Sequence, residues 1–268
     1  MFKKTVAFIG GGNMAEGIIR GMLNTKTIAP ENVKVSEIIP KRRKFLTDTY
    51  GIDTSGEAKE FIGEADIIFL AVRPQDAYAV AMQMKDGIRN EQILISICAG
   101  IDISKLEEWF GEDKKVARVM PNTMIEARHG YSGVCTTDNI TQEDRDTITE
   151  MFHAIGQTMF IPEALFNAFT AYSCAGPAYV LYFIAGMVDA GVESGFSRKN
   201  AASITLQNLI GAAKNIELTG KHPYQLTDRM TSPAGVTIEG LHVLSRTGFH
   251  GIVMDSVRRA LNRTDELG

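Results

Sequence analysis

The sequence predicts an N-terminal α/β domain followed by an all-α domain, and three observations support this prediction. From residue 5 to about residue 161, short β-rich runs alternate with helical stretches, a pattern typical of a parallel sheet covered by helices. A glycine-rich turn directly follows the first of these runs. After Pro162 the β-rich runs cease, and helical periodicity continues to the C-terminus. We therefore expect domains at residues 1–161 and 162–268.

The first domain is expected to contain strands at residues 5–9, 33–37, 67–72, 93–97, 116–120, 131–136 and 158–161. The third of these reads Ile-Ile-Phe-Leu-Ala-Val without a polar residue. Because a strand of this kind is buried on both faces, we expect helices on both sides of the sheet.

The second domain is expected to contain helices at residues 163–172, 177–194, 199–218, 223–230, 233–246 and from 248 to the C-terminus. Pro177 and Pro233 suit the first turn of a helix, where a missing N–H is no loss. Gly195, Gly220 and Gly248 suit helix ends or turns.

One stretch of this domain, residues 178–191, is apolar on nearly every side of the expected helix. Such a helix is either central in a core or shared with another subunit. We favour a subunit interface, because small residues at Ala185, Gly186, Ala190 and Gly191 permit close helix approach. The alternative is the central helix of a monomeric bundle.

The charge pattern gives no indication of a nucleic-acid partner. The net charge is −4, and no basic run exceeds the four residues 41–44. The three cysteines, Cys98, Cys135 and Cys174, are far apart and indicate neither a disulfide framework nor a metal site.

The cysteine usage fits a reducing cytoplasm, and we expect a cytoplasmic protein that does not enter the membrane. The N-terminus leads straight into a strand, so no signal peptide is expected. The longest apolar run, residues 178–188, is expected to be too short to span a bilayer.

The glycine turn predicts a dinucleotide site. In Gly10-x-Gly12-x-x-Ala15 the first glycine permits the turn, the second admits the pyrophosphate to the backbone, and the third small residue packs helix on strand. The turn follows an apolar strand and precedes an expected helix at 14–23, which favours a Rossmann-type domain over an ordinary tight turn. The cofactor-binding residues expected here are Ile9, Gly10, Gly11, Gly12, Asn13 and Met14.

The end of the second strand leaves the choice of cofactor open. Glu37 lies where an acid would bind the adenosine ribose 2′-OH of NADH. Ser36 and the basic residues 41–43, Arg42 among them, are alternatively suited to the 2′-phosphate of NADPH.

Three further strands end in turns that converge on the same predicted edge, at residues 71–74, 96–100 and 120–123. Open α/β sheets bind ligands at the carboxyl ends of their strands. The cofactor-binding residues expected at these ends are Ala71, Val72, Arg73, Pro74, Cys98, Ala99 and Asn122.

Taken in order, these and later motifs resemble the pyrroline-5-carboxylate reductase family over essentially the whole chain. The motifs are IGGGNMA at 9–15, AVRP at 71–74, MPNT at 120–123, GPAY at 176–179, GAAK at 211–214, HP at 222–223 and SPAGVTI at 232–238. The last is specific to the family, whereas the glycine turn is shared with many dehydrogenases.

The resemblance implies a Rossmann domain followed by a helical dimerisation domain, in a family whose homodimers often assemble into decamers. It also implies reduction of 1-pyrroline-5-carboxylate to L-proline with NADPH, or alternatively NADH, as the last step of proline biosynthesis. Hydride transfer to an electrophilic iminium carbon needs mainly correct positioning, so no dedicated acid is expected.

By the same resemblance, Thr237 is the catalytic residue that would hydrogen-bond the ring nitrogen, and two loops would hold the substrate carboxylate. Glu163 matches a family position near the substrate, although it also reads as the first-turn acid of a helix. The substrate-binding residues implied are Glu163, Gly176, Pro177, Ser232, Gly235, Val236 and Thr237.

The chain departs from the family pattern near this expected pocket. Cys174 and Ala175 replace a glycine and a serine, and Ala234 replaces a glycine. Met124 replaces the proline that often follows Asn-Thr in the family. The changes fit neutral drift or a homologue that reduces another cyclic imine acid.

Two other functions stay open at this point. A β-hydroxyacid dehydrogenase would need a lysine acid, for which Lys199 and Lys214 are weak candidates. A non-catalytic nucleotide-sensing protein would keep the cofactor crevice and lose turnover.

Overall fold

The computed structural model describes residues 2–267, which fold into two compact units. The first comprises the chain up to Cys174 together with the residues from Arg263 onward, and the second comprises Ala175–Asn262. The chain therefore returns to the first unit at its C-terminal end. The domain boundary between residues 161 and 162 stays a prediction.

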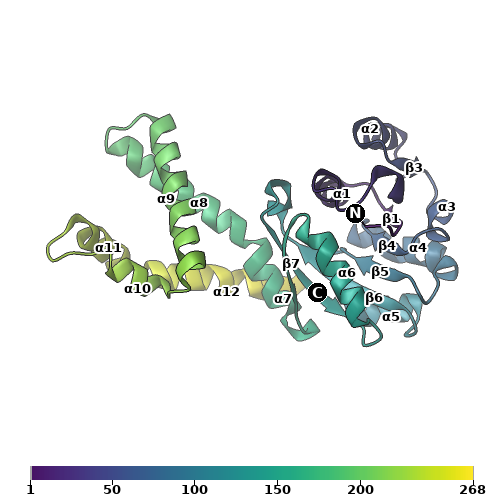
Figure 1. Ribbon diagram of the computed structural model, residues 1–268. Coiled ribbons are helices and arrows are strands. Elements are labelled where there is room, and N and C mark those ends of the chain that lie inside the picture. The colour runs from purple at the N-terminus through teal and green to yellow at the C-terminus, as the bar shows by residue number, and fades with distance from the viewer. Residues whose placement is uncertain (1, 268) are drawn as a thin grey trace. The chain divides into compact units, whose positions relative to one another are not determined.

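The first unit is built on an eight-stranded sheet with helices on both faces (Figure 1). Its strands are β1 (Val6–Ile9), β2 (Val33–Ser36), β3 (Asp53–Ser55), β4 (Ile67–Leu70), β5 (Ile93–Ser96), β6 (Lys115–Pro121), β7 (Gly130–Thr136) and β8 (Gly156–Phe160). Their order across the sheet is β3-β2-β1-β4-β5-β6-β7-β8. The strands predicted from the sequence are all present, whereas β3 was not predicted because its Asp-Thr-Ser sequence lacks an apolar run.

The sheet is mixed, which corrects the expectation of a wholly parallel one. Strands β6 and β7 pair antiparallel, and every other neighbouring pair is parallel. Only residues 122–129 connect β6 to β7, and they hold the short 3-10 helix η3 (Thr123–Ala127). A parallel pair needs a crossover of a dozen residues or more, so this connection is too short for one.

The helices of the first unit are α1 (Asn13–Asn24), α2 (Pro40–Tyr50), α3 (Lys59–Ile62), α4 (Pro74–Met84), α5 (Ile103–Phe110) and α6 (Gln142–His153), with the short 3-10 turns η1 (Pro30–Asn32) and η2 (Lys85–Gly87). Side chains alternate between two apolar cores, one on each face of the sheet. Val6 and Phe8 belong to one core, and Ala7 and Ile9 belong to the other. This two-sided burial explains why β1 and β4 read as unbroken apolar runs.

After β8 the chain passes through η4 (Glu163–Leu165), α7 (Phe166–Phe169) and the π-helical turn η5 (Thr170–Cys174). The second unit is all helical, with α8 (Gly176–Glu193), α9 (Arg198–Thr219), α10 (Pro223–Asp228) and α11 (Val236–Arg246), and α12 (Phe249–Leu267) begins in it. Pro177 lies in the first turn of α8, and Gly195, Gly220 and Gly248 have positive φ at or just beyond helix ends, as predicted.

The predicted helix at 233–246 begins later than expected. Helix α11 starts at Val236 with Gly235 as its N-cap, and Pro233 lies outside it. The Gly235 N–H donates to the Ser232 carbonyl at 3.0 Å, which closes a turn around Pro233 and Ala234. Proline favours the second position of such a turn as well as the first turn of a helix, and the sequence alone does not distinguish them.

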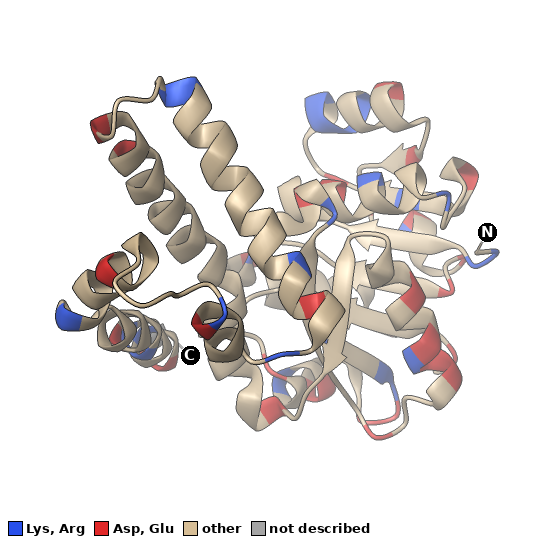
Figure 2. Cartoon of the chain, turned by 60° about the vertical axis from the view of Figure 1, so that its left-hand side comes forward, with Lys and Arg blue, Asp and Glu red and all other residues tan. Residues whose placement is uncertain are grey.

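The second unit leaves most of its apolar surface uncovered. Val188, Ala201 and Leu226 are its buried apolar residues, while Leu181 and Tyr182 on α8 are 58% and 85% exposed. Figure 2 shows long stretches of α8 and α9 without charged side chains. Helices of this composition need a covering surface that this unit does not supply, which supports the predicted subunit interface.

Helix α8 uses its small residues in two ways. A Cβ on Gly191 would lie 2.7 Å from the Ala201 side chain, so Gly191 permits the close packing of α8 on α9. Around Gly186 nothing lies within 4 Å of a built Cβ. The Gly186 face is therefore open to a partner.

The helical segment from Glu163 to Glu193 is long and apolar enough to cross a membrane, judged by length and composition alone. An 18-residue stretch within it has a mean hydropathy of 1.3, and 11% of that stretch is buried within this chain. The sequence predicted no run long enough to span a bilayer, because it considered only the apolar residues 178–188. The helical segment in the structure is longer than that run, so the prediction is wrong on length. An exposed apolar helix of this kind is also expected where two subunits meet.

A candidate dinucleotide and substrate site

The predicted cofactor residues gather at the carboxyl ends of the strands in the first unit. Strand order reverses between β1 and β4, which lie side by side in the sheet. Such a switch point is where open α/β sheets bind ligands. The glycine turn follows β1, and the turn at 71–74 follows β4, so both border this point.

Two glycines of the turn have distinct structural roles. Gly10 has φ of +106°, and a Cβ there would lie 2.4 Å from the Ala71 carbonyl oxygen. Gly12 is the N-cap of α1, and a Cβ there would meet nothing within 4 Å. Gly10 therefore lets β1 and β4 approach, whereas Gly12 leaves open space at the helix N-terminus.

The first turn of α1 presents backbone donors to this space. The Glu16 N–H donates to the Gly12 carbonyl at 2.9 Å, and no side chain caps the helix. The N–H groups of Asn13, Met14 and Ala15 thus precede the hydrogen-bond ladder of the helix. A helix N-terminus of this kind suits a pyrophosphate.

Glu37 and Arg42 both lie against the glycine turn. The Glu37 carboxylate accepts from the N–H groups of Gly11 at 3.0 Å and Ile39 at 2.9 Å. Arg42 Nε donates to the Gly11 carbonyl at 2.7 Å, and its Nη2 pairs with Glu16 at 2.5 Å. The two groups predicted to select the cofactor therefore both contact the glycine turn, and each has its partners within the protein.

Glu16 anchors this arrangement from α1. Burial alone would raise the pKa of its carboxyl, but hydrogen bonds from Tyr50 and Arg42 outweigh burial and hold that pKa below its usual range. Ser36, the other group predicted for NADPH, is 5% exposed, and its carbonyl accepts from Gly10 N–H at 2.8 Å. Its position at the end of β2 is fixed by this bond.

The turns that follow β4 and β5 offer backbone atoms rather than side chains to the expected cofactor. The Cys98 thiol is buried and donates to the Val72 carbonyl at 3.3 Å. Burial raises the pKa of Cys98 to about 11, so the thiol is neutral at pH 7. Cys98 and its neighbour Ala99 therefore offer main-chain atoms, while the Arg73 guanidinium is exposed and pairs with Asp76 at 2.8 Å.

Asn122, at the end of β6, is 7% exposed and uses its whole amide within the protein. Its Oδ1 accepts from the N–H groups of Met124 at 3.1 Å and Tyr131 at 3.3 Å. Its Nδ2 donates to the Ser173 carbonyl at 3.2 Å and lies 3.4 Å from the Ser173 hydroxyl. Asn122 thus connects the carboxyl end of β6 to the segment that precedes α8.

Glu163 forms an ion pair with the buried Arg118, which sequence reasoning did not identify. Arg118 lies on β6 with its side chain 7% exposed, and its Nη1 donates to Glu163 Oε1. Its guanidinium also stacks over the Phe166 ring at 3.9 Å. An arginine inside the apolar run VARVM was the available signal, because a charge there requires a buried partner.

The pair leaves hydrogen-bonding capacity unused. Within residues 2–267, Glu163 Oε2 and Arg118 Nε are buried without a hydrogen-bond partner. Burial and, after it, the Glu163 carboxylate raise the pKa of the neighbouring Cys135 thiol to about 12. The neutral Cys135 thiol is therefore the donor that lies beside the Glu163 carboxylate.

In the second unit, the predicted substrate loop forms the N-terminus of α11. Gly235 is its N-cap without a side-chain cap, and a Cβ there would lie 2.4 Å from Ser232 Oγ. Val236 is 92% exposed, and Thr237 is exposed in the first turn. Among the residues described, none hydrogen-bonds the Thr237 hydroxyl, so it is available to a ligand.

Gly176 and Pro177 open α8 at the other predicted substrate loop. The N-cap is Ala175, which has no side chain able to cap the helix. A Cβ on Gly176 would meet nothing within 4 Å. The Cys174 thiol lies 4.0 Å from the Pro121 carbonyl, and burial raises its pKa to about 11, which disfavours a role as a nucleophile.

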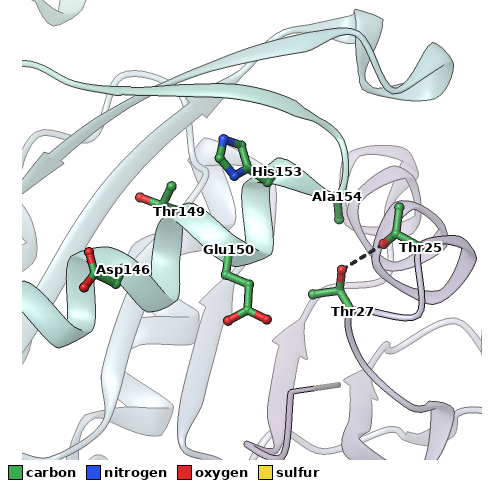
Figure 3. A pocket seen from close by; sticks show the side chains of 7 residues that line it. All are labelled: Thr25, Thr27, Asp146, Thr149, Glu150, His153 and Ala154. Atoms are coloured by element: carbon green, nitrogen blue, oxygen red, sulfur yellow. Dashed lines mark hydrogen bonds between the residues drawn. The ribbon is translucent and has the colours of Figure 1, made fainter.

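A cavity of about 410 Å³ lies elsewhere in the first unit (Figure 3). It is lined by Thr25, Thr27, Asp146, Thr149, Glu150, His153 and Ala154. The two threonines follow the C-terminal end of α1, which is a helix length from the glycine turn. The other lining residues lie in α6 or, in the case of Ala154, directly after it. None of them is a predicted site residue, and among residues 2–267 no cluster of three His, Cys, Asp or Glu could hold a metal ion.

Comparison with known proteins agrees with this arrangement in both parts of the chain. Residues 163–267 match the family model described as pyrroline-5-carboxylate reductase dimerisation. Residues 5–100 match the model described as NADP oxidoreductase, coenzyme F420-dependent. The first match begins at the residue that pairs with Arg118.

Individual relatives match over the full length. The pyrroline-5-carboxylate reductase of Methanosarcina acetivorans is 37% identical over 100% of this chain and 99% of its own. The crystal structure of Plasmodium falciparum pyrroline carboxylate reductase with NADP bound has 31% identity and a TM-score of 0.88, covering 100% of this chain and 99% of that one. A Coxiella burnetii pyrroline-5-carboxylate reductase reaches a TM-score of 0.93 at 26% identity, with the same coverage.

These matches confirm the predicted fold class, with an N-terminal NADP-binding α/β domain and a helical dimerisation domain. They also confirm the resemblance drawn from the sequence motifs. The chain belongs to the pyrroline-5-carboxylate reductase family.

Proposed function

We infer that this protein reduces 1-pyrroline-5-carboxylate to L-proline with NADPH, the last step of proline biosynthesis. The observation that carries this inference is the full-length similarity to pyrroline-5-carboxylate reductases, which covers both units. A β-hydroxyacid dehydrogenase would not account for the match of the helical half.

The residues around the glycine turn fit a dinucleotide phosphate. The open space at Gly12 and the free N–H groups of Asn13 and Met14 would receive the pyrophosphate. Arg42 would hold the 2′-phosphate from its position beside Gly11. NADPH, when bound, supplies the hydride.

The substrate carboxylate would be held by backbone donors. Helices α8 and α11 both begin without a side-chain cap, and their first N–H groups attract an anion. Small residues at Gly176 and Gly235 keep both N-termini accessible. The carboxylate would thereby be fixed without a cationic side chain.

Thr237 would orient the ring nitrogen. Its hydroxyl has no partner among the described residues, and it lies one position after the exposed Val236. A hydroxyl can accept from a protonated imine and donate to the amine product. We propose that Glu163 supplies a negative charge near the substrate, as the sequence resemblance implies.

The exposed apolar helices of the second unit support a homo-oligomer, and the dimerisation match agrees. We propose the homodimer as the basic assembly, with decamers as the further assembly implied by the sequence resemblance. We propose the cytoplasm as its location, since three free cysteines fit a reducing compartment.

The test is cofactor oxidation at 340 nm with 1-pyrroline-5-carboxylate, with NADPH and NADH compared, and with the six-membered piperideine carboxylate as a second substrate. Efficient turnover of the five-membered ring is expected. Preference for the six-membered ring would instead indicate another cyclic imine acid, as the missing hydroxyl at Ala175 allows. Cofactor binding without turnover of either ring would favour a nucleotide sensor.

The role of Thr237 is tested by Thr237→Ala against Thr237→Ser. The alanine variant should lower kcat by about tenfold or more with little change in NADPH affinity, because one hydrogen bond to a charged group is lost. The serine variant keeps the hydroxyl and should retain most of the activity. A wild-type rate in the alanine variant would refute the assigned role.

A further inference from the structure

We propose that Asn122 is a positioning residue that holds the substrate loop of α8 in place rather than a cofactor ligand. This inference rests on the proposed function, because it concerns the loop at Gly176 and Pro177 that would hold the substrate carboxylate. The sequence pattern predicts that Asn122 binds the cofactor, whereas in the structure its side chain contacts Ser173, just before the substrate loop.

The amide of Asn122 has one orientation that satisfies its surroundings. Two backbone N–H groups, from Met124 and Tyr131, face its Oδ1 at 3.1 and 3.3 Å. The Ser173 carbonyl faces its Nδ2 at 3.2 Å. A flipped amide would set donors against donors and an acceptor against an acceptor, so the network fixes the side chain.

Burial leaves this amide little capacity for a ligand. Asn122 is 7% exposed, and both of its polar atoms have partners within the first unit. A nicotinamide contact through the side chain would require one of these bonds to break. The side chain therefore joins two parts of the protein.

The bond to Ser173 fixes the backbone directly before α8. Ser173 lies in the π-helical turn η5, three residues before Gly176. A second contact supports the same point, since the Cys174 thiol lies 4.0 Å from the Pro121 carbonyl. The end of β6 thus holds the chain at two consecutive residues ahead of the loop.

Arg118 holds the other end of the same segment. It lies on β6, four residues before Asn122, which directly follows that strand, and it pairs with Glu163 at the start of η4. Strand β6 therefore fixes residues 163 and 173 from positions that also border the cofactor edge.

The test uses Asn122→Ser in the full-length oligomer. Serine is as good an N-cap as asparagine, so η3 keeps its cap, but the side chain is too short to reach Ser173. We expect the KM for 1-pyrroline-5-carboxylate to rise at least tenfold, while the dissociation constant for NADPH, measured by fluorescence titration, changes less than twofold. The control Ser173→Ala keeps the carbonyl acceptor and should stay near wild type.

Hydrogen exchange gives a readout that does not depend on turnover. Amides at residues 173–178 should exchange at least fivefold faster in Asn122→Ser than in wild type, whereas amides of α1 should not change. If wild type fails to reduce the substrate, the proposed function fails, and exchange still decides whether Asn122 holds the loop.

Either of two results would overturn the proposal. One is weaker NADPH binding with an unchanged substrate KM, which would make Asn122 a cofactor ligand. The other is unchanged exchange at residues 173–178. If Asn122→Ser does not fold, Asn122→Asp, which keeps the acceptor and replaces the donor, is measured in the same way.

Discussion

Breaking the Arg118–Glu163 pair is expected to lower the free energy of unfolding by about 2 kcal/mol in Glu163→Gln. Removing one partner of a fully buried pair costs about 3–5 kcal/mol, because the other charge stays buried without compensation. Arg118 is 7% exposed, but the Glu163 side chain is 35% exposed, so water would solvate part of the site. Glutamine also keeps an oxygen that can accept from Nη1, which reduces the loss further.

A double-mutant cycle separates the pair from the individual side chains. Arg118→Met keeps an unbranched apolar side chain, but it removes the guanidinium that stacks over Phe166 and leaves Glu163 without its cation. The double variant has no buried charge at this site, so it should be less destabilised than the two single effects added together. We expect a coupling energy of about 1.5 kcal/mol, within the range measured for contacting residues.

The assay is urea unfolding followed by circular dichroism at one fixed protein concentration, since the stability of an oligomer depends on concentration. Lys34→Met, which removes the cation of an ion pair whose acid, Asp53, is 63% exposed, serves as a control and should cost less than about 1 kcal/mol. Purely additive effects of Arg118→Met and Glu163→Gln would refute the reasoning, because they would show that the two charges do not stabilise each other.

Two further predictions concern backbone strain and acid sensitivity. Ala234 has φ of +54°, so Ala234→Gly should stabilise the protein by about 1 kcal/mol in thermal unfolding, and a lower melting temperature would contradict this. Burial alone would raise the pKa of Asp144, but bonds from Lys115 and Thr141 outweigh burial and lower that pKa. Its contribution is therefore present above the unfolded pKa near 3.9 and is lost as pH falls through the lower folded value. Asp144→Asn should cost about 1–2 kcal/mol at pH 7, and less in urea unfolding below pH 4; a cost independent of pH would contradict this assignment.

The elements that the sequence predicted well are those with a local signal. Strands β1 and β4 are unbroken apolar runs, and the glycine turn follows β1 directly. The helix ends at Gly195 and Gly220 depend on a backbone conformation that glycine adopts without strain. In each case, a few consecutive residues are enough to predict the element.

The features that were missed depend on contacts between distant residues. Arg118 and Glu163 are 45 residues apart, and Asn122 and Ser173 are 51 apart. The antiparallel pairing of β7 follows from the length of a connection rather than from the strand sequence. No periodicity in the sequence reports which partner a buried arginine or asparagine finds.

The departures from the family pattern can now be assessed from their backbone positions. Ala175 is the N-cap of α8, and Ala234 lies in the turn before α11, so both changes occur at helix N-termini whose N–H groups are the proposed carboxylate donors. Replacing a serine with Ala175 removes a hydroxyl but leaves those N–H groups in place. Replacing a glycine with Ala234 adds strain at a positive φ but keeps the turn that the Gly235 N–H closes on the Ser232 carbonyl. Because the expected recognition is made by backbone, both substitutions are compatible with the retained reaction, and their cost falls on affinity and stability rather than on the chemistry.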